Sequence, residues 1–139
     1  MKNFIRLLGV AVLCFSAAAL VSCGGNNTDE GQTQMNNTYV QISAEEAKAL
    51  MDSETDFVII DARTQEEYDA GHIRGAVLIP EYEIAQRAEN ELPDKNQLIL
   101  VYCRSGRRSK IASQALADLG YTNVREFGGI IDWEYETVK

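Results

Sequence analysis

The sequence predicts an α/β fold with a mostly parallel central sheet of about five strands and helices on both faces. Short apolar runs at residues 57–60, 76–79, 98–102 and 124–127 predict buried strands. Helical segments separate these runs, and this alternation is typical of parallel sheets, whose neighbouring strands need a crossover connection. Ligands in such folds bind at the carboxyl ends of the strands.

Local signals place the helices between the strands. Ser43 and Thr64 each stand three residues before a glutamate, the capping-box spacing that begins a helix. Pro80 ends one strand, and Gly120 ends the helix that follows the central strand. In chain order we expect a strand at 39–42, a helix from 43 to about 51, a strand at 57–60, a short helix from 64, a turn at 71–75, a strand at 76–79, a helix at 82–91, a strand at 98–102, a helix at 110–119, a strand at 124–127 and a last helical turn after 129.

The N-terminal residues predict a targeting segment. Lys2 and Arg6 precede an uncharged apolar run that is short for a membrane span. The run ends in Leu20-Val21-Ser22-Cys23, which resembles a bacterial lipobox and predicts a lipoprotein signal peptide at residues 1–22 with lipidation of Cys23. An ordinary cleaved signal peptide, or an uncleaved anchor, is the alternative.

Residues 23–38 are mostly polar and predict a flexible tether, because they cannot bury enough apolar surface to offset their ordering. Residues 39–139 then form one globular domain. We therefore expect a lipid-anchored protein of the cell envelope, facing the periplasm or the cell exterior. We expect the protein to be a monomer.

Charge and cysteine content exclude several functions. The chain carries 13 Lys and Arg against 21 Asp and Glu, a net charge of −8, which argues against general nucleic-acid binding. Of the three cysteines, Cys14, Cys23 and Cys103, only the last belongs to the expected domain. This excludes an internal disulfide and a Cys-rich zinc site there, and it disfavours a dithiol oxidoreductase.

The segment at residues 103–109 concentrates the chemistry of the domain. Cys103 follows the central strand, and a short turn leads from it into a helix. The unpaired N–H groups and the dipole of a helix N-terminus favour a thiolate and attract an anionic substrate. Four cationic side chains add to this effect, those of Arg104, Arg107, Arg108 and Lys110. The alternative is a buried structural cysteine beside a solvated basic face.

Three spaced motifs resemble the rhodanese family of sulfurtransferases in its single-domain form. The first comprises Asp61-Ala62-Arg63, Glu67-Tyr68, Gly71-His72-Ile73 and Gly75-Ala76; the second is Cys103-Arg104-Ser105-Gly106-Arg107-Arg108-Ser109; the third is Gly128-Gly129 with Trp133. The resemblance as a whole covers about residues 39–139. The loop at 103–108 has six residues, whereas related phosphatases and arsenate reductases have one more, and Ser109 stands where their longer loop places its arginine. The resemblance therefore disfavours phosphatase chemistry.

The resemblance implies transfer of sulfane sulfur through a Cys103 persulfide, with no metal or organic cofactor. The thiolate attacks a small anionic donor such as thiosulfate, and a thiol or cyanide acceptor then takes the sulfur. The implied substrate-binding residues are Arg104, Ser105, Gly106, Arg107, Arg108 and Ser109, with Arg108 also able to turn inward and brace the loop. The alternative is a rhodanese-like binding or carrier module that serves a protein partner without turnover.

Three further residues receive supporting roles. We expect Asp61 to accept loop N–H groups or to pair with an arginine, although a second acid–base role stays open. Arg63 either touches substrate or braces Glu67 or Asp61. His72 is expected to be a structural hydrogen-bonding residue in a turn rather than a catalytic base.

Overall fold

The computed structural model describes residues 37–139. The expected signal peptide at 1–22, the lipidation site Cys23 and nearly all of the tether at 23–38 lie outside the described residues, and their assignments stay predictions. Within the described range, no helix is both long enough and apolar enough to cross a membrane.

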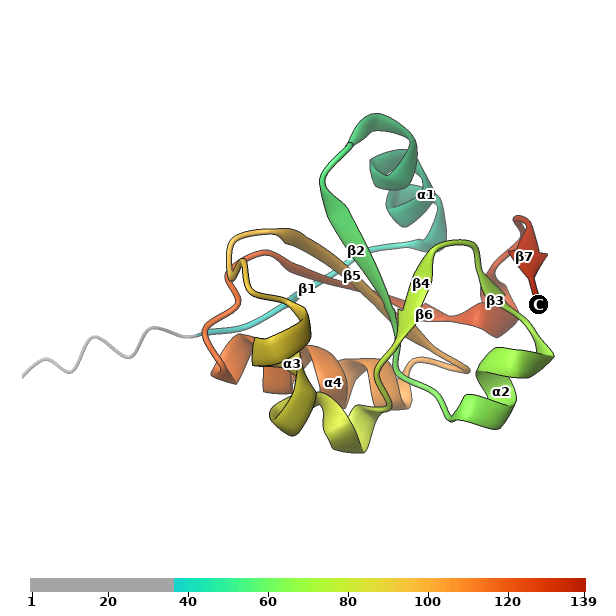
Figure 1. Cartoon of the computed structure of the whole chain (residues 1–139). Helices are drawn as coiled ribbons and strands as arrows, with labels where there is room; N and C mark the ends of the chain where they lie inside the picture. Colours follow the sequence, from blue (N-terminus) through green and yellow to red (C-terminus); the bar gives the residue numbers. More distant parts are fainter. Residues whose placement is uncertain (1–36) are drawn as a thin grey trace, which may run out of the picture. The chain divides into compact units, whose positions relative to one another are not determined.

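The core of the domain is a five-stranded sheet in the order β1-β6-β5-β2-β4, and every pairing in it is parallel (Figure 1). This confirms the predicted fold class. Its strands are β1 (Val40–Gln41), β2 (Phe57–Asp61), β4 (Ala76–Leu78), β5 (Leu98–Cys103) and β6 (Val124–Gly129).

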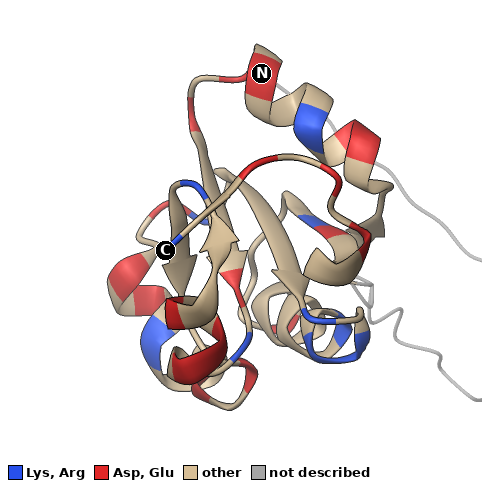
Figure 2. Ribbon diagram, turned by 90° about the vertical axis from the view of Figure 1, so that its right-hand side faces the viewer, with Lys and Arg blue, Asp and Glu red and all other residues tan. Residues whose placement is uncertain are grey.

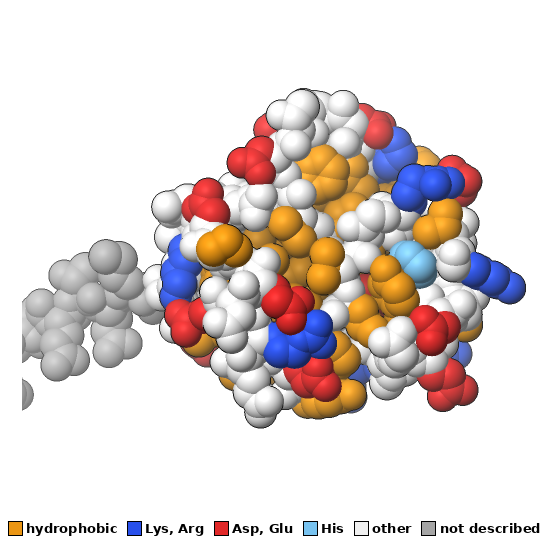
Figure 3. Space-filling view, in the orientation of Figure 1, with side chains coloured by type: hydrophobic (Ala, Val, Ile, Leu, Met, Phe, Trp, Pro, Cys, Tyr) orange, Lys and Arg blue, Asp and Glu red, His pale blue; other side chains and the backbone are white. Residues whose placement is uncertain are grey.

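Helices cover both faces of this sheet (Figure 1). On one face, α3 (Ile84–Glu91) and α4 (Arg107–Asp118) enclose a core with Ile60, Val101 and Leu116. On the other face, α1 (Ala44–Ser53) and the C-terminal segment enclose Leu100, Phe127 and Trp133. The remaining elements are α2 (Gln65–Ala70), β3 (His72–Ile73), β7 (Thr137–Val138) and the single-turn 3₁₀ helices η1 (Glu81–Glu83) and η2 (Ile130–Asp132). The face drawn in Figure 3 carries apolar side chains between α1 and α3, with charged side chains around them.

Both predicted capping boxes are present. The Ser43 Oγ accepts the Glu46 N–H at 3.1 Å, and the Glu46 carboxylate accepts the Ser43 N–H at 2.7 Å. Thr64 and Glu67 make the same reciprocal pair at 3.3 and 3.2 Å. These bonds satisfy N–H groups that the first turn of each helix leaves without partners, so they define where α1 and α2 begin.

The central strand β5 decides where the Cys103 sulfur lies. All six of its residues are buried, and their side chains alternate between the two cores. Leu98, Leu100 and Tyr102 face α1, so Cys103 at the end of the strand faces α4.

The structure differs from the predictions at two places that bear on the site. The helix expected at 110–119 begins at Arg107, because Gly106 adopts a left-handed conformation with φ of 96° and turns the chain directly into the helix. Arg107, Arg108 and Ser109 therefore lie in a helical first turn. The turn expected at 71–75 contains β3, which pairs antiparallel with β7. A two-residue strand is too short for a periodic signal, so the sequence did not predict this pair.

Candidate active site

The site is built around the Cys103 sulfur atom at the carboxyl end of β5. The residue is 1% exposed, and its Sγ accepts the Gly106 N–H at 3.1 Å. The strand, the left-handed Gly106 and the first turn of α4 together fold the backbone around the sulfur. The predicted juxtaposition of strand end, turn and helix N-terminus is present.

Two opposing effects act on the ionisation of Cys103. Burial raises the pKa of this thiol, whereas hydrogen bonds from the Ser109 hydroxyl and from the Ser109, Ser105 and Gly106 N–H groups lower it. The donors prevail, so the pKa of Cys103 lies below the ordinary thiol value. The Cys103 sulfur therefore has the environment of a reactive cysteine rather than that of an inert buried one.

The cations near the sulfur divide into two groups. Arg104, Arg107 and Lys110 are exposed, and none of them forms an ion pair with any residue of the described part of the chain. Arg108 instead binds Glu67 of α2 with two bonds of 2.7 and 2.8 Å. Figure 2 shows Lys and Arg residues on several elements of the domain, the helix at the lower right among them. Arg108 thus has the geometry of the bracing alternative, and the exposed cations are free to meet an anion.

Asp61 and Arg63 form a buried network below the loop. The Asp61 carboxylate accepts the Arg63 Nε–H at 2.9 Å and the Tyr102 hydroxyl at 2.6 Å, and Arg63 Nη2 also donates to the Gly71 carbonyl at 2.7 Å. Asp61 is fully buried and Arg63 is 5% exposed. Burial, together with the Asp61 charge, raises the pKa of Tyr102, which stays a neutral donor. The arrangement matches the expected pairing of Asp61 with an arginine and braces the ends of β2 and β5.

His72 lies in β3 and contacts α2. Its Nδ1 is 3.0 Å from the Tyr68 carbonyl oxygen, and its ring stacks on the Tyr68 ring with centroids 3.7 Å apart. These contacts are those expected of a structural histidine, although the residue lies in a short strand and not in the predicted turn.

Gly129 lets β6 pass directly beneath the cysteine loop. A Cβ atom at this position would come within 2.2 Å of the Arg104 carbonyl oxygen and 2.6 Å of the Ser105 Cα. Only glycine permits this approach, and the η2 turn that follows donates the Ile131 N–H to the same carbonyl at 3.3 Å. The Gly128-Gly129 motif therefore packs against the backbone of the cysteine loop.

Sequence reasoning missed one residue of this region, Glu126. It is 2% exposed and accepts the Ser109 hydroxyl at 2.6 Å and the Gly128 N–H at 2.8 Å. A signal was available, because Glu126 shares a face of the strand with Val124 two positions earlier. A carboxylate at a core-facing position calls for hydrogen-bonding partners, and those partners are the elements around Cys103.

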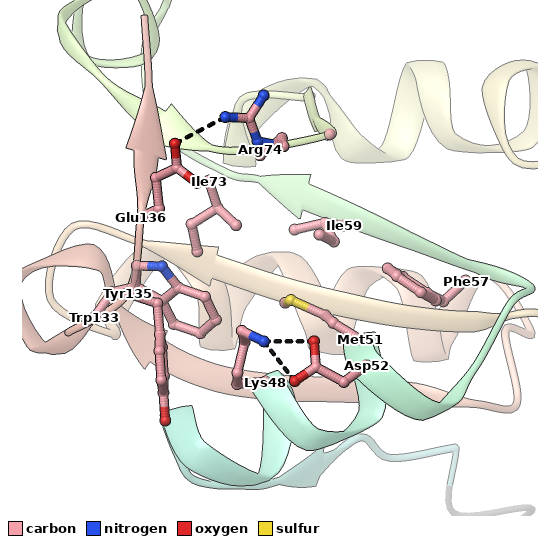
Figure 4. A pocket seen from close by; sticks show the side chains of 11 residues that line it. Lys48, Met51, Asp52, Phe57, Ile59, Ile73, Arg74, Trp133, Tyr135 and Glu136 are labelled. Atoms are coloured by element: carbon pink, nitrogen blue, oxygen red, sulfur yellow. Dashed lines mark hydrogen bonds and ion pairs between the residues drawn. The ribbon is translucent and has the colours of Figure 1, made fainter.

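A separate cavity of about 390 Å³ lies on the α1 face and does not include Cys103 (Figure 4). Trp133, Tyr135, Phe57 and Met51 line it, with the Lys48–Asp52 and Arg74–Glu136 ion pairs nearby. Trp133 is 9% exposed and belongs to the core as well as to this cavity. No cluster of three His, Cys, Asp or Glu side chains suited to a metal occurs in residues 37–139.

Comparisons with known proteins agree on one family. A family model described as Rhodanese-like domain matches residues 43–136. The chain is 41% identical over 80 residues to the thiosulfate sulfurtransferase PspE of Escherichia coli (strain K12), covering 58% of this chain and 77% of that protein. It is 36% identical over 115 residues to the putative sulfur carrier protein YrkF of Bacillus subtilis (strain 168), covering 82% of this chain and 59% of that protein. The solved structure of a rhodanese with anions from E. coli aligns with a TM-score of 0.57 at 40% identity, over 60% of this chain and 98% of that one.

Replacing Gly129 with alanine is expected to distort the cysteine loop, because the new Cβ meets its backbone. Such overpacking costs roughly 3 kcal/mol of unfolding free energy, and displaced N–H groups shift the alkylation of Cys103 to higher pH. Urea unfolding and alkylation rates against pH measure the two effects. Gly75→Ala is the control for the alkylation profile. Its φ of +82° makes alanine costly in unfolding free energy there as well, but its Cβ meets nothing within 4 Å. An unchanged alkylation profile in Gly129→Ala contradicts this role.

The Glu67–Arg108 pair predicts a specific acid dependence of stability. The Arg108 hydrogen bonds lower the pKa of Glu67 to about 2, from an ordinary 4.5. The contribution of the pair to the unfolding free energy is therefore complete above pH 4.5 and disappears as the pH falls toward 2. The wild-type protein should exceed Glu67→Gln in unfolding free energy by about 1–2 kcal/mol at neutral pH, after allowance for solvent screening.

Urea unfolding at a series of pH values measures this difference, with Glu66→Gln as the exposed neighbouring control. A difference that does not change between neutral pH and pH 2 would exclude the pair as its source.

Proposed function

We propose that this chain, which belongs to the rhodanese-like domain family, transfers sulfane sulfur from thiosulfate or a similar donor to a thiophilic acceptor through a Cys103 persulfide. The family match and the PspE relative support sulfur transfer as the general chemistry. One observation carries the specific proposal: Cys103 ends a buried strand and has backbone N–H groups directed at its sulfur.

The first step is attack of the Cys103 thiolate on the outer sulfur of thiosulfate. A bond forms between the two sulfur atoms, the bond from the sulfane sulfur to the sulfonyl group breaks, and sulfite leaves with the electron pair. The protein then carries a persulfide anion, and no proton is consumed. A thiolate or cyanide ion attacks the outer sulfur in the second step and releases the Cys103 thiolate.

The charges around the loop suit an anionic donor and an anionic product. Arg104 and Arg107 are exposed and unpaired among the described residues, so we assign them to the donor and to the leaving sulfite. Ser105, Gly106 and Ser109 supply the groups that hold the persulfide. Arg108 is occupied by Glu67, and we assign it to bracing the loop. We assign Asp61 and Arg63 to bracing the ends of β2 and β5, and His72 to packing against α2.

The size of the loop separates sulfur transfer from phosphate chemistry. Residues 103–108 form a short loop whose N–H groups reach the cysteine sulfur itself. A persulfide adds one atom to that sulfur, whereas a phosphate group would need a wider ring of donors. We therefore expect no phosphatase activity.

A carrier role is the second candidate, because one relative is the putative sulfur carrier protein YrkF. A carrier would also form the Cys103 persulfide but would deliver the sulfur only to a partner protein. Turnover with a small acceptor distinguishes the two roles.

Exposure of the protein to thiosulfate should add the mass of one sulfur atom to Cys103, and sulfite should appear in equal amount. With cyanide present, the wild-type protein should produce thiocyanate continuously, while Cys103→Ser produces none. Arg104→Ala and Arg107→Ala should raise the thiosulfate KM with smaller effects on kcat. Loading without turnover would favour the carrier, and failure to load would refute both roles.

We also propose that Cys23 is lipidated, placing the domain on an envelope membrane. The argument is the Leu20-Val21-Ser22-Cys23 sequence, which precedes the described residues. Mass spectrometry of the protein from the membrane fraction of a bacterial host should find a diacylglyceryl group on Cys23 as the first residue. An unmodified N-terminal peptide beginning elsewhere would refute the assignment.

A further inference from the structure

The cavity on the α1 face has the dimensions of a small-molecule site and takes no part in the proposed sulfur chemistry. It encloses about 390 Å³, within the range of roughly 300–1,000 Å³ that is usual for ligand pockets. Cys103 does not line it and belongs to the core on the other face of the sheet. The lining residues come from α1, from β2, from β3 with the turn after it, and from the chain that follows η2 (Figure 4). We call this space the α1-side cavity.

The walls of the α1-side cavity are apolar and rich in aromatic rings. Ile59 and Ile73 are 4% and 3% exposed and form its most buried wall. Trp133 and Tyr135 lie at one end and Phe57 lies at the other (Figure 4). The Trp133 and Tyr135 rings meet edge to face, with centroids 4.8 Å apart. A flat apolar ring suits such walls, because aromatic surfaces pack well against one another and are stabilised by removal from water.

The charged side chains at this cavity are already paired with one another. Lys48 pairs with Asp52, and the Arg74 Nη2 lies 2.9 Å from the Glu136 Oε1. The lining therefore contains two cations and two anions, and each of the four has an opposite charge beside it. A charged ligand would have to compete with one of these pairs and would meet no excess of the opposite sign. The lining thus favours an uncharged occupant.

One polar group of the lining has no hydrogen-bonding partner. The Trp133 side chain is 9% exposed, and its indole Nε1 has no acceptor among residues 37–139. Buried donors are nearly always hydrogen-bonded, so this N–H is a place where an added acceptor would be stabilising. The nitrogen is itself covered, so an acceptor reaches it after a small turn of the indole. The neighbouring Tyr135 ring is 38% exposed and can move outward to allow this turn.

We propose that the α1-side cavity binds a small, uncharged aromatic molecule that carries a carbonyl group or a similar hydrogen-bond acceptor. The ring of this ligand lies between Phe57 and the Trp133–Tyr135 pair, and its acceptor takes the Trp133 Nε1–H. The site is separate from Cys103, so the proposal goes beyond sulfur transfer and does not depend on it.

Other occupants match fewer of these features. An acyl chain, or an apolar side chain of a second copy, would cover the walls but would leave the Trp133 N–H without an acceptor. An aromatic carboxylate would supply an acceptor but would bring a charge to a lining that is already balanced. An uncharged aromatic ketone, ester or amide satisfies the walls, the charges and the N–H together.

The experiment titrates the nitrogen-15-labelled protein with 1-indanone, a bicyclic aromatic ketone, and follows the N–H signals by NMR. Trp133 is the one tryptophan of the chain, so its indole N–H gives a single identifiable signal. The ketone should shift the amide signals of Ile59, Ile73 and Gly75 saturably and should move the indole proton downfield. The absence of a saturable shift, or shifts confined to residues 103–109, would overturn the proposal.

Two analogues of the same bicyclic frame test the chemical class of the ligand. Indane lacks the carbonyl group, so it should shift the amide signals without moving the Trp133 indole proton downfield. Indane-2-carboxylate carries a charge and should bind more weakly than 1-indanone. A downfield shift with indane, or equal or tighter binding of the carboxylate, contradicts the assigned class.

A matched pair of tyrosine variants tests the location. Tyr135→Ala removes one aromatic wall and should weaken 1-indanone binding at least about threefold. Tyr82→Ala is the control, because Tyr82 is 67% exposed on η1 and does not line the cavity. Undiminished affinity in Tyr135→Ala, or equal weakening in both variants, excludes this location. Thermal unfolding checks that the variants are folded, and the wild-type titration decides if Tyr135→Ala is not.

Two further measurements separate this site from the cysteine and from self-association. Cys103→Ser should bind 1-indanone as the wild type does, whereas loss of binding would place the ketone at the sulfur site. The cavity signals of the wild type without ketone should stay unchanged over a range of protein concentrations. A concentration-dependent shift would identify a second copy as the occupant and refute the small-molecule site.

Discussion

The site depends on hydrogen bonding to a sulfur atom that is buried. A thiolate covered by apolar side chains would be strongly disfavoured, and here the Ser109 hydroxyl and the N–H groups of Ser109, Ser105 and Gly106 replace the lost water. These donors are available because β5 ends at Cys103 and the left-handed Gly106 begins α4 within one short turn. The bracing contacts of Glu67 with Arg108, and the close approach of Gly129, keep that turn in place. The environment of the thiol is thus set by the backbone of the turn together with the Ser109 hydroxyl, and the surrounding side chains hold that turn in position.

The elements with strong local signals were predictable. Two capping boxes, the apolar runs of β2 and β5, and the helix that follows Cys103 all follow from local physical chemistry, and the structure confirms each of them. The bidentate Arg108–Glu67 pair was foreseen only in part, because the sequence could not decide between an inward brace and a substrate contact. That choice depends on where α2 lies relative to α4, which is a tertiary property.

Other features could not be read from the chain alone. The β3–β7 pair joins residues that are 66 positions apart in the case of His72 and Val138, and neither strand is long enough to show alternation. Alternation from Val124 could have indicated that Glu126 faces the core, but its hydrogen-bonding partners depend on the register of β6 against β5 and β1, which local patterns do not fix. The charge of Glu126 also argues against burial, since a glutamate in a strand usually faces solvent.

The depth of Cys103 has a consequence for which sulfur atom an acceptor can reach. Its Sγ is almost fully covered, and the proposed persulfide would place a second sulfur about 2 Å further out. An approaching nucleophile meets that outer sulfur first. When the S–S bond breaks, the acceptor keeps the outer sulfur and Cys103 keeps its own. Attack on the inner atom would instead leave the acceptor joined to the protein as a mixed disulfide. The burial of the Cys103 Sγ therefore favours transfer of the outer sulfur to the acceptor over formation of an inactive mixed disulfide.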